Sequence, residues 1–363
     1  MLDLTTLTAR RICVIKPSAL GDVVQALPLL EALRARFPAS QISWVINREL
    51  ADLISGHPLI HDLLIFDRHG SWTQTLGLLR SLRRGRFDLV IDLQGLLRTG
   101  AMTLATGAPT RVGLETAREG ASLACHLVLP ETSREIPAHA RYWKVAEALG
   151  IDTPRGSAHI PASLTDFTVA QKLLAPLRAN STGVLAVHAG AKWETKRWPA
   201  EKFAEVAVRA ATRLRVGIAV VGSSSEHPLA AQIADAVISA GGVAANLAGT
   251  TNLKQLAAVL KSADVVLSND SGPMHLAAEQ ETRVVGLFTC TNALRSGPPG
   301  PQHRLISTTV PCAGEYHKIC PHAGGARHAC FDALDLERVW QAVRSQFGAL
   351  ADDTRYAVES PAA

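Results

Sequence analysis

The sequence predicts an α/β protein with two doubly wound parallel sheets. Short apolar runs alternate with amphipathic helical patterns along the chain, and strands that alternate with helices build right-handed βαβ units around a parallel sheet. Residues 154–165 interrupt the alternation with the Pro, Gly, Ser and Thr of a linker. The length of 363 residues also favours two domains. We therefore expect an N-terminal domain over 1–160, a C-terminal domain over 161–345 and a disordered tail over 346–363.

Strands and helices are predicted in alternation in the first half. Apolar runs predict the strands, and apolar residues three or four positions apart predict the helices. In chain order these elements are a strand at 11–15, a helix at 23–36, strands at 42–46 and 63–66, a helix at 76–84 and a strand at 89–92.

The second half repeats this pattern. Pro199 stands at the start of one predicted helix, where its missing N–H is not needed. In chain order the elements are a strand at 184–187, a helix at 200–214, a strand at 217–221, helices at 228–240 and 253–262, strands at 264–267 and 283–288, and a helix at 335–347.

A polar turn follows a predicted strand near each end of the chain. Residues 16–22 are KPSALGD, and residues 269–279 are NDSGPMHLAAE. Each turn leads into a helix, whose free N–H groups and positive dipole end can bind an anion. Because ligands of such sheets bind at the carboxyl ends of the strands, the turns predict a cleft between two α/β domains with a phosphate-bearing ligand on one side.

The composition argues against nucleic-acid-binding and membrane-spanning classes. The net charge is only +5, and 3 Tyr and 8 Phe leave little for base stacking. No apolar window reaches the ~18 residues of a spanning helix, and the N-terminus lacks the regions of a signal peptide. We therefore expect a cytoplasmic protein whose 6 cysteines are reduced. The mild positive charge permits an acidic substrate or an anionic membrane surface.

Five motifs occur in the order found in one known protein family. Besides the two turns, they are FDLVIDLQGLLRT at 87–99, TARE at 116–119 and KRWP at 196–199. On these motifs the chain resembles the ADP-heptose:lipopolysaccharide heptosyltransferases, glycosyltransferase family 9, and TARE is similar to the first-acting members. The resemblance implies a GT-B fold of two Rossmann-like domains, an inverting, metal-independent mechanism and an ADP-sugar donor.

The resemblance assigns the general base to the first turn. Asp22 would take the proton of the acceptor hydroxyl, although an Asp after Gly is also an ordinary helix cap worth ~1 kcal/mol. Lys16 and Ser18 flank this turn, where they face a substrate anion or are simply a solvated Lys and a turn Ser. The matching acceptor segments contain Asp92, Gln94, Arg98 and Arg118.

The donor residues carry over to the second half. Lys196 would contact the donor phosphates and stabilise departing ADP, and Glu226 would hold the ribose hydroxyls or simply begin a helix. Ser271 and Gly272 would lie against the pyrophosphate, and Asp270 would orient the turn or bind donor hydroxyls. His275, on the first turn of the next helix, would contact the donor.

The resemblance also implies the substrates and the location of the protein. The donor would be ADP-L-glycero-D-manno-heptose, with no separate cofactor. The acceptor would be Kdo-lipid A or inner-core lipopolysaccharide, whose carboxylates and phosphates suit Arg. The protein would contact the cytoplasmic face of the inner membrane peripherally, with no nucleic-acid partner.

Two segments depart from the family pattern. Members commonly have Gly-Pro-Thr where residues 289–292 are TCTN, near the donor nucleotide or sugar. Cys312, Cys320 and Cys330 are interleaved with three His, which leaves inert cysteines, a structural metal site and a disulfide as alternatives, since no paired C-x-x-C is present. A comparable three-Cys loop occurs in many family members, and the loop here is more similar to that of later-acting members, in conflict with TARE.

Three other functions are weighed against heptose transfer. The first is transfer of another nucleotide-linked sugar or transfer to another surface glycan. The second is a nucleotide-sugar binding protein without turnover, against which Asp22 and Lys196 both argue. The third is a dehydrogenase, but no G-x-G-x-x-G follows the first strand.

Overall fold

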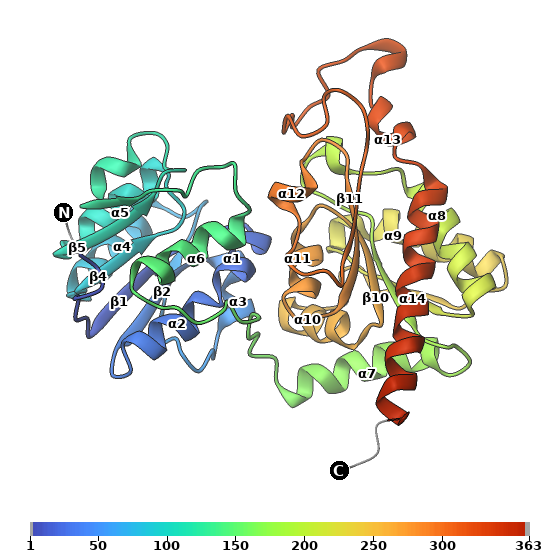
Figure 1. Ribbon diagram of the computed structural model, residues 1–363, viewed down its shortest axis with the longest axis horizontal. Coiled ribbons are helices and arrows are strands. Elements are labelled where there is room, and N and C mark those ends of the chain that lie inside the picture. The colour runs from blue at the N-terminus through green and yellow to red at the C-terminus, as the bar shows by residue number, and fades with distance from the viewer. Residues whose placement is uncertain (1–2, 360–363) are drawn as a thin grey trace. The chain divides into compact units, whose positions relative to one another are not determined.

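The computed structural model describes residues 3–359, with side chains described as far as 350. It divides into two compact units, Met1–Pro161 and Ala162–Ala363, and the division falls inside the predicted linker (Figure 1). Each unit holds one six-stranded parallel sheet. The predicted fold class, two doubly wound α/β domains, is confirmed.

The N-terminal unit has its strands in the order β3-β2-β1-β4-β5-β6, all parallel. Its elements are β1 (Arg11–Ile15), α1 (Leu20–Ala26), α2 (Leu29–Arg36), β2 (Gln41–Asn47), the 3-10 helix η1 (Arg48–Leu50), α3 (Ala51–Ile54), β3 (Asp62–Phe66), α4 (Trp72–Arg84), β4 (Leu89–Asp92), α5 (Leu97–Thr106), β5 (Thr110–Leu114), the 3-10 helix η2 (Ala121–Ala124), β6 (Leu127–Leu129) and α6 (Ala138–Ala148).

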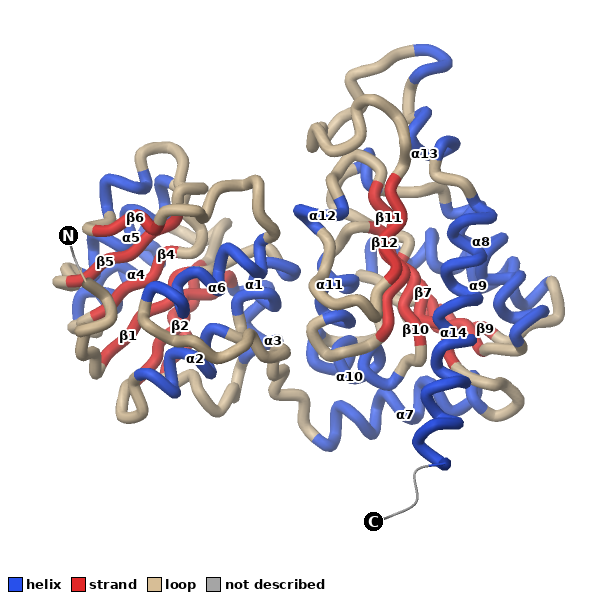
Figure 2. Tube along the Cα trace, in the orientation of Figure 1, coloured by secondary structure: helices blue, strands red, loops and turns tan. Residues whose placement is uncertain are grey.

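Helices cover both faces of this sheet (Figures 1 and 2). Helices α1, α2 and α6 pack together on one face, and α4 packs beside α5 on the other. Leu82 of α4 and Met102 of α5 are buried against Cys13 and Val90 of the sheet. The apolar stripe of each helix therefore faces the strands, as the periodicity predicts.

The C-terminal unit has the order β12-β11-β10-β7-β8-β9, again all parallel. Its elements are α7 (Leu164–Arg178), β7 (Val184–His188), the 3-10 helix η3 (Glu194–Lys196), α8 (Ala200–Arg209), the π-helical turn η4 (Ala210–Leu214), β8 (Gly217–Val220), the 3-10 helix η5 (Ser224–Glu226), α9 (His227–Ser239), β9 (Ala244–Asn246), α10 (Leu253–Ser262), β10 (Val265–Asn269), α11 (Gly272–Ala278), β11 (Arg283–Phe288), α12 (Ala293–Ser296), β12 (Arg304–Ser307), the 3-10 helix η6 (Gly324–Ala326), α13 (Ala329–Ala333) and α14 (Leu336–Glu359).

Both sheets have the same connectivity. The first strand of each unit is central, the second and third lie to one side, and the fourth to sixth lie to the other. Successive strands are therefore added on opposite sides of β1 and of β7, and the strand order reverses between β1 and β4 and between β7 and β10. Ligands of doubly wound sheets bind at the carboxyl ends of the strands at this switch point. The register pairs Ile15 with Asp92 and His188 with Ser268, so the residues that follow these strands meet there.

One predicted helix is two helices in the structure. The sequence predicts a continuous helix over 23–36, but α1 ends at Ala26 and α2 begins at Leu29. Pro28 separates them, because proline has no N–H to donate and its ring clashes with the preceding turn.

The linker and the C-terminus also differ from the prediction. Helix α7 begins at Leu164, inside the predicted linker, because Ser163 accepts a hydrogen bond from Asp166 N and caps it. Helix α14 continues to Glu359, over most of the predicted tail; residues 360–363 lie outside the described part of the chain. The helix passes Gly348, since one glycine inside a helix costs only ~1 kcal/mol.

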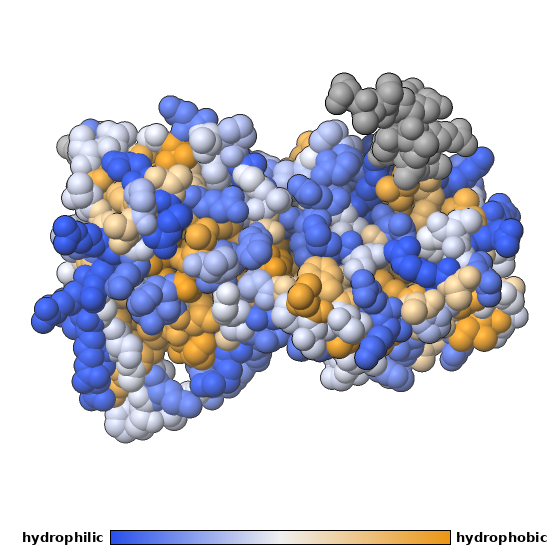
Figure 3. All heavy atoms as spheres, turned by 90° about the horizontal axis from the view of Figure 1, so that it is seen from below, coloured by the Kyte–Doolittle hydropathy of each residue, from blue (hydrophilic) through white to orange (hydrophobic). Residues whose placement is uncertain are grey.

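Hydrophilic side chains cover much of each unit on the face shown in Figure 3, with hydrophobic patches between them. Among the described residues, no helix is long and apolar enough to cross a membrane.

Candidate functional site

The candidate site of the N-terminal unit centres on Lys16, which follows β1 and is only 3% exposed. Its Nζ lies 3.6 Å from Asp22 Oδ2 and 3.4 Å from Gln94 Oε1. It also lies 5.2 Å from the centroid of the Tyr142 ring. Burial lowers the pKa of Lys16, and the charge of Asp22 opposes that effect. The solvated-lysine interpretation is therefore wrong, because this cation is held inside the site.

Asp22 lies in the first turn of α1 with its side chain 38% exposed. Its Oδ2 accepts a hydrogen bond from Ala19 N at 3.3 Å, and its Oδ1 accepts one from the Tyr142 hydroxyl at 2.9 Å. The carboxylate thus caps the helix start and also keeps an open side. Capping and a role in proton transfer are compatible in this geometry. Ser18, in the same turn, is partly buried.

Tyr142 is a site residue that sequence reasoning missed. It lies on α6, which packs against α1, and is 3% exposed. Burial first, and then the charge of Asp22, raise the pKa of Tyr142 well above its usual value. The phenol therefore stays protonated and donates to Asp22. No local motif marks Tyr142, because it meets Asp22 only through helix packing.

A second turn of this candidate site follows β4. Asp92 is buried, and its Oδ1 accepts hydrogen bonds from Gln94 N at 2.9 Å and Gly95 N at 3.0 Å. Burial raises the pKa of Asp92 against these bonds. Asp92 therefore supports the turn from below, rather than facing an acceptor. Its bonds hold Gln94 where the amide oxygen meets Lys16.

The TARE segment is joined to the same turn. Arg118 N donates to Gly95 O at 2.8 Å, and Gly95 has φ +65°, with Ala117 Cα only 2.8 Å from where a Cβ would be. Only glycine suits this position. Arg118 is exposed, as is Arg98, whose guanidinium lies 6.0 Å from the Phe66 ring centroid. The structure thus groups the loops that carry Lys16, Gln94 and Arg118 at one edge of the sheet.

The candidate site of the C-terminal unit centres on a buried ion pair. Lys196 Nζ lies 2.7 Å from Asp270 Oδ2, and the Asp270 side chain is 5% exposed. The Thr291 hydroxyl donates to the same oxygen at 2.7 Å, and His275 Nε2 lies 3.8 Å from Oδ1. Burial would raise the pKa of Asp270, but His275 and Lys196 outweigh it and lower the pKa to about 2. Asp270 is therefore an anion that organises three neighbours.

Thr291 was not singled out as a site residue. It lies in the TCTN segment that departs from the family pattern. The hydroxyl of Thr289 in this segment also donates to Thr195 O, next to Lys196, at 2.5 Å. The TCTN segment is thus hydrogen-bonded both to Asp270 and to the residue before Lys196.

His188, at the end of β7, links the remaining donor residues. Its Nδ1 lies 3.0 Å from Ser271 Oγ, and its Nε2 lies 3.6 Å from Glu226 Oε2. The imidazole of His188 beside it lowers the pKa of Glu226 to about 2, against the effect of burial. The sequence signal for His188 was present, since it is a polar residue at the end of a buried strand.

Glu226 also completes the capping box of the short 3-10 helix η5, of which it is the last residue. Its Oε2 accepts hydrogen bonds from Ser223 N and Ser223 Oγ, both at 2.8 Å. The helix-start interpretation of Glu226 is therefore correct. A Cβ on Gly190 would come within 1.7 Å of Glu226 Oε1, so the glycine after β7 makes room for this carboxylate.

Gly272 begins α11, and Ser271 precedes it in an extended conformation. His275 is 6% exposed, and among the described residues its Nδ1 has no hydrogen-bond partner. Lys196, Glu226, Asp270, Ser271, Gly272 and His275 thus gather at the switch point of this sheet.

The Cys-rich loop does not form a ligand set. Cys312 and Cys320 are partly buried, Cys330 is buried, and all three are free thiols. Within the described residues, no three His, Cys, Asp or Glu are grouped so that they could hold a metal ion. Burial, together with the nearby thiols, raises the pKa of Cys330 to about 11, so it stays protonated and unreactive at neutral pH.

Comparison with known proteins decides the family. The sequence profile of glycosyltransferase family 9 (heptosyltransferase) matches residues 75–324. The chain belongs to this family. The match includes every donor-side candidate, together with Gln94, Arg98 and Arg118. Lys16 and Asp22 precede it, so their place in the site rests on geometry.

Individual relatives agree with this family 9 assignment. The chain is 29% identical over 311 residues to the lipopolysaccharide core heptosyltransferase OpsX of Haemophilus influenzae, covering 84% of this chain and 86% of the relative. Its fold is similar to a family 9 glycosyltransferase from Veillonella parvula (TM-score 0.79, 24% identity, 95% and 98% covered). It is also similar to the E. coli heptosyltransferase WaaC with ADP (TM-score 0.69, 22% identity, 93% and 99% covered). These similarities confirm the GT-B fold.

Proposed function

We propose that the protein is an inverting glycosyltransferase that moves heptose from ADP-L-glycero-D-manno-heptose to the Kdo/heptose inner core of lipopolysaccharide. The family match over 75–324 carries the proposal, and the relative named for this activity aligns over 84% of the chain. The solved structure of WaaC holds ADP, the product that such a transfer releases.

The N-terminal unit binds the acceptor in this proposal, and Asp22 is the general base. Its open carboxylate takes the proton as the acceptor oxygen attacks the anomeric carbon. Lys16, Ser18 and Gln94 line the same edge. The exposed guanidinium groups of Arg98 and Arg118 bind Kdo carboxylates or lipid A phosphates.

The C-terminal unit binds the donor. Transfer breaks the bond between the anomeric carbon and the β-phosphate oxygen, and negative charge grows on departing ADP. Lys196 stabilises that charge, while Asp270 holds Lys196 in place at 2.7 Å. Ser271, Gly272 and His275 line the pyrophosphate, and Glu226 binds the ribose hydroxyls.

No metal or other cofactor takes part in the proposed reaction, because Lys196 supplies the cation that the leaving group needs. The protein acts at the cytoplasmic face of the inner membrane, where a lipid-linked acceptor is presented. Its contact with that membrane is peripheral.

The test is ADP release from ADP-heptose, with and without a Kdo-bearing lipid A acceptor. Acceptor-dependent release is the expected result. Tight ADP binding without release would overturn heptose transfer and favour another nucleotide-linked sugar, the second candidate. The TCTN segment is the reason for that candidate, because Thr291 contacts Asp270 directly.

Replacing Tyr142 by Phe is expected to change the pH profile of transfer. The phenol donates to Asp22 at 2.9 Å, and a donor to a carboxylate favours its charged form. Without it, the acid limb of the kcat profile should move to higher pH, and stability should fall by ~1 kcal/mol. Steady-state kinetics between pH 4 and 9 measure this shift.

Tyr316→Phe is the matched control, because its hydroxyl lies 2.7 Å from the hydroxyl of Ser296 and not beside a carboxylate. It should leave the acid limb unchanged. An acid limb that does not move in Tyr142→Phe would remove Tyr142 as a positioning residue for Asp22.

A further inference from the structure

Helices α4 and α5 expose large apolar side chains on their outer surface. Trp72 is 73% exposed and Leu76 37% on α4, Leu97 62% and Leu104 55% on α5, and Leu123 87% on η2. These are all the exposed large hydrophobic residues of the N-terminal unit within the described residues. We call this surface the α4–α5 face.

The five residues belong to neighbouring elements. Helix α4 packs beside α5, and η2 packs against α5. Gly100 allows this close packing, because a Cβ at this position would lie only 3.0 Å from Ala121 Cα. The spacing of Leu97 and Leu104 places them on one stripe of α5, and Trp72 and Leu76 share a stripe of α4. The same elements bury Leu82 and Met102 inward, so the outer residues are not needed for the core.

Arginines outnumber carboxylates on this face, where Glu119 Oε2 accepts a hydrogen bond from Leu97 N at 3.1 Å. Neither α4, α5 nor η2 contains Asp or Glu. Arg80, Arg83 and Arg84 continue the exposed side of α4, and Arg98 stands beside Leu97 on α5. An amphipathic surface with Trp and Leu on one part and Arg on the other is typical of proteins that lie on anionic lipid.

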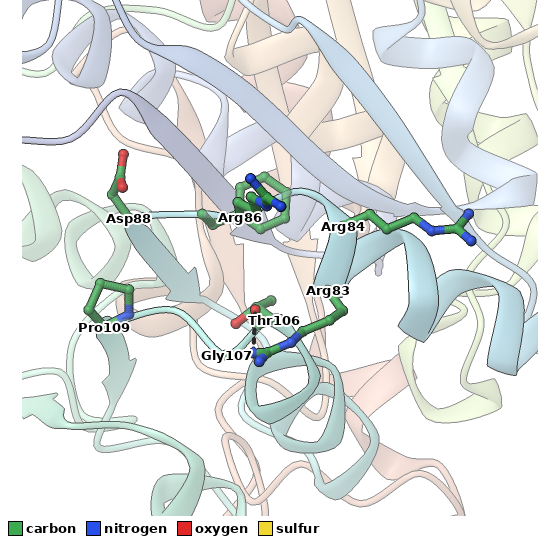
Figure 4. Close-up of a pocket in the computed structure, with 8 residues that line it drawn as sticks. Arg83, Arg84, Arg86, Asp88, Thr106, Gly107 and Pro109 are labelled. Atoms are coloured by element: carbon green, nitrogen blue, oxygen red, sulfur yellow. Dashed lines mark hydrogen bonds between the residues drawn. The ribbon is translucent and has the colours of Figure 1, made fainter.

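At the C-terminal end of α4, where its arginines lie, the surface has a hollow of about 590 Å³ at the amino ends of the strands (Figure 4). Arg83, Arg84 and Arg86 line it, with Asp88 as the one carboxylate. A neighbouring hollow shares Arg84, Arg86 and Asp88 and adds Arg10 and Arg11.

The single carboxylate does not neutralise these cations. Asp88 Oδ2 accepts hydrogen bonds from the backbone N–H groups of Arg10 and Arg11 at 2.8 and 2.9 Å. The Arg83 guanidinium donates to Thr106 O, and the Arg11 guanidinium donates to Gly85 O. The donors that remain suit phosphate groups.

We propose that the α4–α5 face docks the protein on an anionic phospholipid membrane, with Trp72 and the leucines among the acyl chains and the arginines on lipid phosphates. The proposal rests on the proposed function, since a lipid-linked acceptor is met only at a membrane. The charge of the face favours this occupant, because clustered arginines beside exposed Trp and Leu are attracted to the phosphates of an anionic lipid surface.

Sedimentation with vesicles tests the proposal on the full chain. One set contains phosphatidylethanolamine and phosphatidylglycerol, and the other contains only phosphatidylcholine. The wild type should bind the anionic vesicles at least tenfold better, and added salt should weaken that binding. The triple variant Trp72→Gln, Leu97→Gln, Leu123→Gln and the double variant Arg80→Gln, Arg84→Gln should each lose at least tenfold.

The matched control replaces three exposed apolar residues of the C-terminal unit, Leu164, Ile238 and Val243, by Gln; they are 87%, 54% and 42% exposed. This variant should bind as the wild type does. Bromine-labelled acyl chains should quench the emission of the wild type more than that of Trp72→Phe, which isolates the contribution of Trp72.

Activity on a soluble Kdo acceptor without acyl chains separates the two proposals. All variants should transfer heptose to it at the wild-type rate in the absence of vesicles. Wild-type protein that transfers but ignores anionic vesicles would overturn the docking face alone. Equal loss of binding in the control variant would also overturn it. Vesicle binding without any transfer would overturn the proposed function instead.

Discussion

Replacing Asp22 by Asn should reduce heptose transfer by about 10²–10⁴-fold, the usual contribution of a general base. Asn has nearly the same shape, and its oxygen can still accept from Ala19 N or Tyr142, which now contact the carboxylate at 3.3 and 2.9 Å. It cannot take a proton from the acceptor hydroxyl. The rate of ADP release at saturating substrates measures the effect.

Donor binding should survive this change, because all the proposed donor residues belong to the C-terminal unit. Calorimetric titration with ADP should therefore give the wild-type affinity. Asp52→Asn is the matched control, since Asp52 lies in the first turn of α3 and is exposed. Asp22 would lose its assignment as the base if the variant kept more than a tenth of wild-type turnover.

The local sequence predicts where the site residues of each unit lie along the chain, but it does not predict which of them contact one another. Lys16 and Asp270 directly follow buried strands, so the polar turns could be predicted from hydropathy alone. Tyr142 reaches Asp22 across 120 residues. That contact depends on how α6 packs on α1, which no local pattern encodes.

Residue type alone also suggested ligand-binding roles that the geometry of the structure does not support. Asp92 looked like an acceptor ligand, but at 1% exposure it supports the Gln94 turn from inside. The cysteines and histidines of 312–330 suggested a metal by their number. Coordination needs several ligands converging on one point, and the described side chains do not converge.

Removing the Lys196 cation from the site of the C-terminal unit should impair both transfer and stability. Lys196→Met leaves Asp270 buried without its closest cation. Breaking a buried pair costs about 3–5 kcal/mol. Here the loss should be about 2 kcal/mol, because Lys196 is 17% exposed and Thr291 and His275 remain beside Asp270. Transfer should fall by about 10²–10³-fold, as for loss of one donor to a leaving group.

The surface pair of Lys202 and Asp332 provides a matched control for stability. Its atoms are 2.8 Å apart, but Asp332 is 86% exposed. Lys202→Met should therefore change the free energy of unfolding by less than about 1 kcal/mol. Urea denaturation of both variants measures the difference, and equal effects would show that burial does not strengthen the Lys196–Asp270 pair.

The double variant Lys196→Met, Asp270→Asn separates the structural role of the pair from its chemical one. Without the buried anion, no charge is left uncompensated, so stability should recover to within about 1 kcal/mol of the wild type. Transfer should stay as low as in Lys196→Met, because the cation that faces departing ADP is still missing. If transfer recovered together with stability, Lys196 would serve only to neutralise Asp270, and another group would have to stabilise the leaving pyrophosphate.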